Sequence, residues 1–192
     1  MAENRTAWID VCGWFADARP VVSPNANERP PGTAVDLLVI HNISLPPEQY
    51  GGHEVEQFFC NRLDPHGHPY FQTIAGLKVS AHLFIRRCGE LVQFVSVDRR
   101  AWHAGRSRFG ARDNCNDFAV GIELEGSDHC SYTDAQYRRL VGCCRALMAR
   151  FPGIGPDRIV GHADIAPARK TDPGPAFDWP RLRAALLSGE RS

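Results

Sequence analysis

The sequence lacks several features that would point to particular classes of protein. It contains no apolar run near the roughly 18 residues that a membrane-spanning helix needs. Its first ten residues also lack the apolar stretch of a secretory signal. Lysine plus arginine and aspartate plus glutamate are equal, at 22 each, whereas binding to nucleic acid or an acidic membrane usually requires a basic excess. We therefore expect no nucleic-acid partner and no membrane partner.

Paired cysteines are missing as well. The seven cysteines are odd in number, and none belongs to a Cys-x-x-Cys motif. This argues against a four-cysteine zinc site and against a disulfide framework. We expect most of the cysteines to be small buried apolar residues in a reducing compartment. Together with the missing signal, this predicts a cytoplasmic protein.

The chain also has no internal repeat and no low-complexity linker, so its 192 residues are expected to form one domain. Its clearest strand covers residues 118–125, where Phe118, Val120, Ile122 and Leu124 alternate with Ala119, Gly121, Glu123 and Glu125. Two small residues beside two carboxylates on the second face leave room above the sheet.

The other predicted elements indicate a sheet with helices against it. Further strands are expected over 35–40, 79–85, 90–97 and 158–160, and a long polar loop over 99–116. Helices are expected over 53–63, from a capping box at Thr133-Asp134-Ala135-Gln136 to Phe151, and from a cap at Asp178 to about Leu187. The predicted fold class is α/β (α+β).

Two of the eight histidines follow apolar strands and are therefore expected on a rigid frame. His41 follows the run 35–40, and His162 follows Ile159-Val160-Gly161. Open sheets tend to bind ligands just beyond such strand ends. A hydrolytic zinc site needs three protein ligands, an open position for water and a nearby carboxylate base.

Carboxylates for such a site are present, but spacing alone leaves their roles open. Asp164 and Asp172 lie close to His162 along the chain, and Glu123 and Glu125 share one strand face. None of this is a short ligand motif such as His-Glu-x-x-His. The remaining candidates, His82 and His103, are interpreted equally well as residues that line a site or as packing residues.

Six segments, in order along the chain, resemble motifs of the AmpD family. They are residues 39–47, 79–82, 100–105, 115–118, 121–126 and 162–175. The family consists of N-acetylmuramyl-L-alanine amidases that act on 1,6-anhydro muropeptides. The resemblance implies one amidase domain over 1–192 with a catalytic core of about 14–180. It also implies a central mixed sheet flanked by helices, as in amidases and peptidoglycan recognition proteins.

The resemblance also implies roles for five residues. His41, His162 and Asp172 would bind one zinc ion, which lowers the pKa of bound water from about 15.7 toward roughly 7. Glu123, not Glu125, would carry the proton of the attacking water. Lys170 would lie beside the developing oxyanion, where one good donor stabilises the transition state by roughly 3–4 kcal/mol.

Structural interpretations compete with some of these roles. Lys170 could be a solvated charge in a proline-rich loop. Asp164 could cap a turn or orient His162. Glu125 could be a surface or salt-bridged residue.

Substrate contacts follow from the resemblance at Lys78, Trp102 and Arg169, because a muropeptide needs a cation for its carboxylates and an aromatic wall. Some relatives carry arginine where this chain has Lys78, and lysine keeps the charge without the bidentate fork. Trp102 could equally be a residue that packs its loop.

The expected function is hydrolysis of the amide bond between the lactyl group of anhydro-N-acetylmuramic acid and L-alanine, in cell-wall recycling, by a monomer. A second hypothesis is a peptidoglycan-fragment binding protein on the same scaffold without catalysis. The complete set of ligands and catalytic groups argues against it. A third is an amidase of polymeric wall outside the cytoplasm, which the missing signal disfavours.

Overall fold

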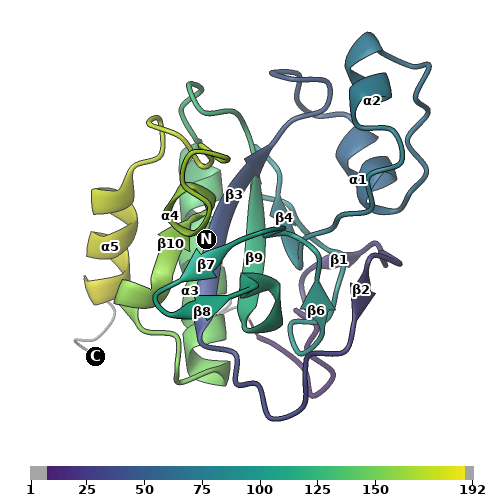
Figure 1. Ribbon diagram of the computed structural model, residues 1–192. Helices are drawn as coiled ribbons and strands as arrows, with labels where there is room; N and C mark the ends of the chain where they lie inside the picture. The colour runs from purple at the N-terminus through teal and green to yellow at the C-terminus, as the bar shows by residue number, and fades with distance from the viewer. Residues whose placement is uncertain (1–7, 189–192) are drawn as a thin grey trace.

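The computed structural model describes residues 8–188 and centres on one mixed sheet (Figure 1). The sheet has six strands in the order β1-β5-β4-β9-β3-β10. Their bounds are β1 Arg19–Pro20, β3 Leu37–Ile43, β4 Leu83–Ile85, β5 Leu91–Gln93, β9 Ala119–Glu125 and β10 Ile159–Gly161. Strands β4 and β5 run antiparallel, and the other four neighbouring pairs are parallel. The predicted mixed sheet is confirmed.

The helices lie on both sides of this sheet, which gives the predicted single α/β domain. Their bounds are α1 Glu54–Phe59, α2 Pro69–Thr73, α3 Asp134–Arg150, α4 His162–Ile165 and α5 Trp179–Leu187. Figure 1 shows α1 and α2 together at one corner and α3 behind the sheet. Within residues 8–188, no helix is both long and apolar enough to cross a membrane. The first seven residues, which carry most of the segment tested for a signal, lie outside the described part.

The long parallel strands β3 and β9 form the centre of the sheet, and both of their faces are covered. Val120, Ile122 and Leu124 of β9 pack with Leu140 and Leu147 of α3 in the largest apolar cluster. All seven residues of β9 are buried, as expected for strands of a largely parallel sheet. The predicted alternation over 118–125 is confirmed, since Gly121 and Glu123 face the opposite side, where the candidate site lies.

Helix α3 begins at the predicted capping box. The Thr133 hydroxyl accepts a hydrogen bond from the Gln136 N–H at 3.1 Å, and the Gln136 side-chain oxygen accepts one from the Thr133 N–H at 3.0 Å. The Gln136 amide also donates to the carbonyls of Ile85 and Glu125. The cap therefore fixes the helix to the carboxyl ends of β4 and β9. The predicted cap of α5 is also present, because Asp178 accepts from the Arg181 N–H at 2.9 Å.

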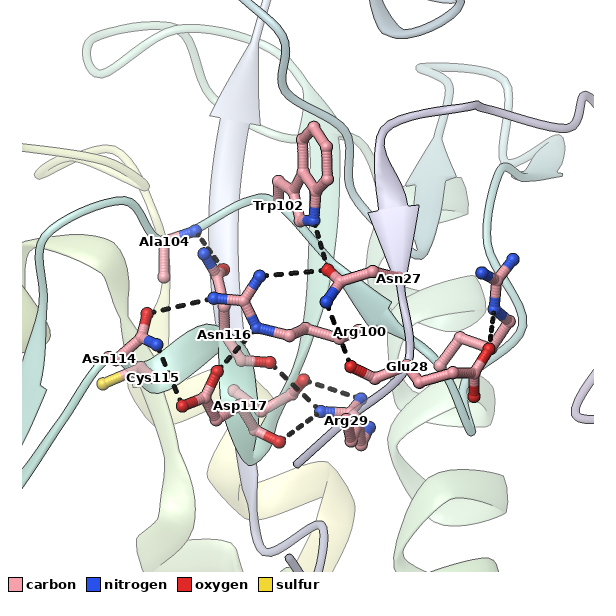
Figure 2. A network of polar contacts seen from close by, with 12 residues as sticks. Asn27, Glu28, Arg29, Arg100, Trp102, Ala104, Asn114, Cys115, Asn116 and Asp117 are labelled. Atoms are coloured by element: carbon pink, nitrogen blue, oxygen red, sulfur yellow. Dashed lines mark hydrogen bonds and ion pairs between the residues drawn. The ribbon is translucent and has the colours of Figure 1, made fainter. Parts of the chain in front are cut away.

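The segment 99–116 is more ordered than the predicted long loop. It contains β6 (Arg100–Ala101), which pairs with β2 (Ala26–Asn27), and a hairpin of β7 (Arg108–Phe109) and β8 (Arg112–Asp113). A 3₁₀ helix, η1 (Cys115–Asp117), follows, and a second, η2 (Pro156–Arg158), precedes β10. The polar side chains of this segment bond to one another (Figure 2), which composition alone does not reveal.

Three predicted strands differ in their boundaries, among them 90–97, which is reduced to Leu91–Gln93 in β5. His41 lies inside β3 and not after it, because β3 continues to Ile43 along β9. Strand β4 is shorter than 79–85 because its partner on one side, β5, pairs over three residues only.

The cysteines behave largely as predicted. All seven are free thiols, and Cys60, Cys115, Cys143 and Cys144 are buried. Burial raises the pKa of Cys143 to about 12, so this thiol stays protonated and behaves as an apolar residue.

The capping box predicts a measurable contribution to stability. Thr133→Ala removes a helix cap and should lower the free energy of unfolding by about 1 kcal/mol, measured by urea denaturation. Thr133→Ser, which keeps the hydroxyl, is the control and should retain most of the stability. Equal losses in the two variants would show that the methyl group, not the cap, matters.

Candidate metal centre and its cavity

Three potential metal ligands converge from different parts of the chain. His41 comes from β3, His162 is the first residue of α4 directly after β10, and Asp172 lies in the loop that follows. Strands β3 and β10 pair in parallel with Gly161 opposite Ile40, so the residues that follow, His162 and His41, come side by side. The two histidines are 121 residues apart in the sequence. Pairing of β3 with β10 in the sheet brings them into contact.

The three ligand atoms face one point. The Nδ1 atoms of His41 and His162 are 2.9 Å apart, and Asp172 Oδ2 lies 3.1 Å and 3.0 Å from them. Among residues 8–188, His41, His162 and Asp172 are the group whose ligand atoms lie close enough together to hold a metal ion.

The protonation states of His41 and Asp172 are those that a metal ion requires of its ligands. Burial lowers the pKa of His41 to about 4, and hydrogen bonding to Asp172 opposes the shift only in part, so the imidazole is neutral at pH 7. Burial acts to raise the pKa of Asp172, but its hydrogen bonds with His162 and His41 lower the pKa below the usual range. Neutral imidazole and ionised carboxylate are the forms that bind metals.

The outer nitrogens of both histidines have protein partners. His162 Nε2 lies 3.1 Å from the carbonyl oxygen of Ala104, and His41 Nε2 lies 3.0 Å from His103 Nδ1. The imidazole rings of His41 and His103 meet edge to face. Such partners of metal-ligating histidines are a regular feature of metal sites.

Glu123 lies beside the ligand cluster. It pairs directly with His41 in the β3–β9 register and is 8 % exposed. Its Oε2 is buried and has no hydrogen-bond partner within residues 8–188. Burial raises the pKa of Glu123 well above its usual range, the charge of Asp172 adds to this, and Lys170 opposes it. A carboxyl with a raised pKa can take up and release a proton near neutral pH.

A cavity of about 610 Å³ opens onto these groups. One wall is polar and includes His41, His103, Glu123, Lys170 and Asp172. The opposite wall is mostly apolar and comes from the segment around α1 and α2, with Phe58, Phe59, Ile74, Leu77 and Val79. The volume and the mixture of apolar surface with a few convergent polar groups suit a small-molecule ligand.

Lys170 is exposed and lines the cavity two residues before Asp172. Its backbone N–H donates to the carbonyl of Ala166 at 3.1 Å, within the turn that ends α4. The loop that delivers Asp172 therefore also delivers a cation to the same cavity.

The three predicted substrate contacts lie outside this cavity. Trp102 donates its indole N–H to Asn27 at 2.6 Å (Figure 2). Arg169 donates to the carbonyls of Ala104 and Arg106 and lines a neighbouring hollow. Lys78 lines a separate pocket of about 150 Å³ near α2. Their role in substrate binding stays a prediction.

The residues with open roles are structural or lie at the edge of the site. Asp164 accepts from the Gly161 N–H at 2.7 Å and so caps α4. Glu125 is buried, not on the surface, and its carboxylate accepts hydrogen bonds from the backbone N–H groups of Gly51 and Arg87 without forming an ion pair within residues 8–188. His82 is buried and accepts from the Gly121 N–H, whereas His103 lines the cavity.

One supporting residue was not singled out by the sequence. Asn116 accepts from the backbone N–H groups of both His103 and Ala104. Its only sequence signal is its place within the matched segment 115–118.

The fold and the site define a candidate metal centre on a mixed sheet, and comparison with known proteins identifies the family of the chain. The model of the family "N-acetylmuramoyl-L-alanine amidase" matches residues 31–175. The chain belongs to this family.

Individual relatives narrow the comparison. The chain is 55 % identical to the 1,6-anhydro-N-acetylmuramyl-L-alanine amidase AmpD of Salmonella typhimurium (strain SL1344), covering 91 % of this chain and 92 % of that protein. A crystal structure of a selenomethionine AmpD derivative matches with a TM-score of 0.90 and 53 % identity, covering 93 % of this chain and 98 % of that one. The amidase-like fold and the resemblance to AmpD are thereby confirmed.

A more distant match includes a substrate complex. The amidase AmiD of E. coli, in complex with anhydro-N-acetylmuramic acid-L-Ala-D-γ-Glu-L-Lys, matches with a TM-score of 0.59 and 26 % identity. The match covers 92 % of this chain and 65 % of that one.

Gly121 supplies a test of how tightly the site is packed. A Cβ added there would lie 2.5 Å from the His103 ring. Gly121→Ala should therefore displace that ring, cost about 1–3 kcal/mol of stability as an overpacked core residue, and weaken metal binding measured by titration.

Gly67→Ala is the matched control, because the nearest atom to its added Cβ is 3.4 Å away. It should leave both stability and metal binding close to those of the unchanged protein. Wild-type metal affinity in Gly121→Ala would contradict the close packing of His103.

Proposed function

We propose that the chain is a zinc-dependent amidase that hydrolyses the amide bond between the lactyl group of 1,6-anhydro-N-acetylmuramic acid and L-alanine in muropeptides. The observation that carries the proposal is the convergence of His41, His162 and Asp172 on one point, with Glu123 and Lys170 in the same cavity. Over the 91 % of the chain that aligns with a relative named for this activity, 55 % of the residues are identical.

Zinc suits the three ligands. Ligand atoms about 2.0–2.1 Å from a tetrahedral zinc ion are separated by roughly 3.3 Å, close to the 2.9–3.1 Å found here. Two imidazoles and a carboxylate, with a cavity on the open side, are the donor set and access of catalytic zinc sites. When bound, zinc would supply the Lewis acidity that activates water and polarises a carbonyl oxygen.

Glu123 would move the proton in this reaction. As the water oxygen attacks the amide carbon, Glu123 takes up the proton that the water loses. When the carbon–nitrogen bond breaks, the same proton passes from Glu123 to the leaving amine of L-alanine. The raised pKa of Glu123 suits this transfer, because the carboxyl must hold the proton until the amine departs.

Lys170 would stabilise the charge that develops on the carbonyl oxygen. It lines the cavity from the loop that also holds Asp172, so metal binding would restrict its backbone near the reacting bond. Electrostatic stabilisation that appears only in the transition state lowers the barrier without binding the substrate more tightly.

The cavity favours a free muropeptide as the substrate. Its apolar wall suits the body of a sugar, and the polar wall carries the reacting groups. The AmiD structure, which is 26 % identical, holds an anhydro-muramoyl peptide. We further propose that the amidase core spans about 14–180, works as a monomer and serves peptidoglycan recycling. A cytoplasmic location is consistent with seven free cysteines.

Removal of the metal gives the first test of this function. Dialysis against a chelator should abolish release of anhydro-N-acetylmuramic acid from the anhydro-muramoyl tripeptide, and added zinc should restore it. Product release is measured by chromatography, and metal content by atomic spectroscopy. Full activity of the metal-free protein, or no activity after zinc is restored, would contradict the proposal.

Glu123→Gln separates an enzyme from a protein that only binds peptidoglycan fragments. Loss of a general acid–base should lower kcat by about 10²–10⁴-fold, while calorimetry should show little change in muropeptide affinity. Glu125→Gln is the control. The Glu125 carboxylate accepts hydrogen bonds from two backbone N–H groups. Glu125→Gln should therefore lower the melting temperature but keep kcat within a few fold of that of the unchanged protein. Turnover that is unaffected by Glu123→Gln would remove Glu123 from the mechanism.

A further inference from the structure

One two-residue segment supports both histidines of the candidate metal centre from behind. Strand β6 leads into His103 and Ala104, which are both buried. His103 Nδ1 lies 3.0 Å from His41 Nε2, and the Ala104 carbonyl oxygen lies 3.1 Å from His162 Nε2. Ligands that come from two separate strands therefore share one support.

These contacts fix which ring nitrogen of His41 and of His162 faces the candidate metal site. A carbonyl oxygen can only accept a hydrogen bond, so His162 donates from Nε2 and keeps the lone pair of Nδ1 free. His41 also turns Nδ1 toward Asp172 and His162, which leaves its Nε2–H to donate to His103. Partners of this kind set the tautomer and the ring orientation of metal-ligating histidines.

Two side chains hold the supporting segment: Arg169 donates to the Ala104 carbonyl at 2.8 Å, and Asn116 binds the N–H side of the segment. Asn116, which is 5 % exposed, accepts with Oδ1 from the His103 N–H at 3.0 Å and from the Ala104 N–H at 2.8 Å. Figure 2 shows the amide beside Ala104, at the end of the polar network. Within residues 8–188, no other side chain accepts a hydrogen bond from either of these two N–H groups.

The 3₁₀ helix that carries Asn116 is also fixed in place. Arg29 donates to the carbonyls of Asn116 and Asp117 at 3.2 Å and 3.0 Å. Arg100 donates to the Asp117 carboxylate at 2.6 Å and to Asn114 at 3.2 Å (Figure 2). Asn116 therefore presents its amide from a rigid base to both backbone N–H groups of the segment, whereas Arg169 contacts only the Ala104 carbonyl.

We propose that Asn116 is a positioning residue for the metal centre: by bonding both N–H groups of His103 and Ala104, it holds the segment that orients His41 and His162. This inference rests on the proposed function, because it requires that these histidines and Asp172 bind zinc. A ligand set that is already oriented loses less conformational freedom when the ion arrives. Removal of such outer partners typically weakens metal affinity by about 10–100-fold.

The test compares three changes in the metal-free and zinc-loaded full chain. Asn116→Leu keeps the approximate shape but removes the acceptor, Asn116→Asp keeps an acceptor oxygen, and Asn114→Gly is the matched control. Asn114 belongs to the same network, bonds to Arg100 and Asp117 but not to the 103–104 segment, and has a φ of 60° that glycine adopts without strain.

Zinc affinity is measured by competition with a chromophoric chelator, and ligand geometry by the visible absorption of the cobalt-substituted protein. Asn116→Leu should weaken zinc binding by about 10–100-fold and change the cobalt spectrum. Asn116→Asp should restore affinity and spectrum to near those of the unchanged chain. Asn114→Gly should lower the melting temperature without a change in zinc affinity.

The outcomes separate this inference from the function beneath it. A folded Asn116→Leu protein with unchanged zinc affinity and cobalt spectrum overturns the positioning role. An unchanged chain that binds no zinc overturns the proposed function instead. If Asn116→Leu does not fold, Asn116→Ser decides, because its shorter hydroxyl cannot reach both N–H groups. It should show a smaller loss of zinc affinity, and full affinity in this variant also overturns the inference.

Discussion

The parallel pairing of β3 with β9 on one side and β10 on the other is the constraint on which the site depends. This pairing places Glu123 beside His41 and brings His162 next to His41 from the far end of the chain. A shift of one residue along β9 would turn Glu123 into the apolar cluster against α3 and bring a core residue into the cavity. The apolar packing on one face thus fixes the chemistry on the other.

Burial and mutual charge divide the work among these groups. The same low-polarity surroundings keep His41 neutral and raise the pKa of Glu123, while hydrogen bonding keeps Asp172 ionised. Lys170 stays at the exposed rim, where its charge costs little desolvation. Burial therefore disfavours the charged form of both His41 and Glu123, whereas hydrogen bonds preserve the charge of Asp172 in the same cavity.

Local signals in the sequence were sufficient for the elements that depend on local chemistry. The capping box at Thr133, the alternation over 118–125 and the strand that leads to His162 could be predicted because each depends on neighbouring residues. The supporting roles of His103 and Asn116 could not, because they depend on contacts across the fold. The order within 99–116 was missed for the same reason, since Arg99, Arg100 and Arg112 form ion pairs with residues outside the segment.

The two walls of the cavity come from different elements of the fold, so a change in one wall need not disturb the other. The candidate metal ligands and Glu123 belong to the sheet, to α4 and to the loop after it, whereas the apolar wall is built by the short helices α1 and α2 and their connections. Insertions or exchanges in the helical segment can reshape the ligand-facing surface without touching a single bond of the ligand cluster. Under the proposed function, changes in the helical wall should therefore act on substrate binding, and changes in the ligand cluster on turnover.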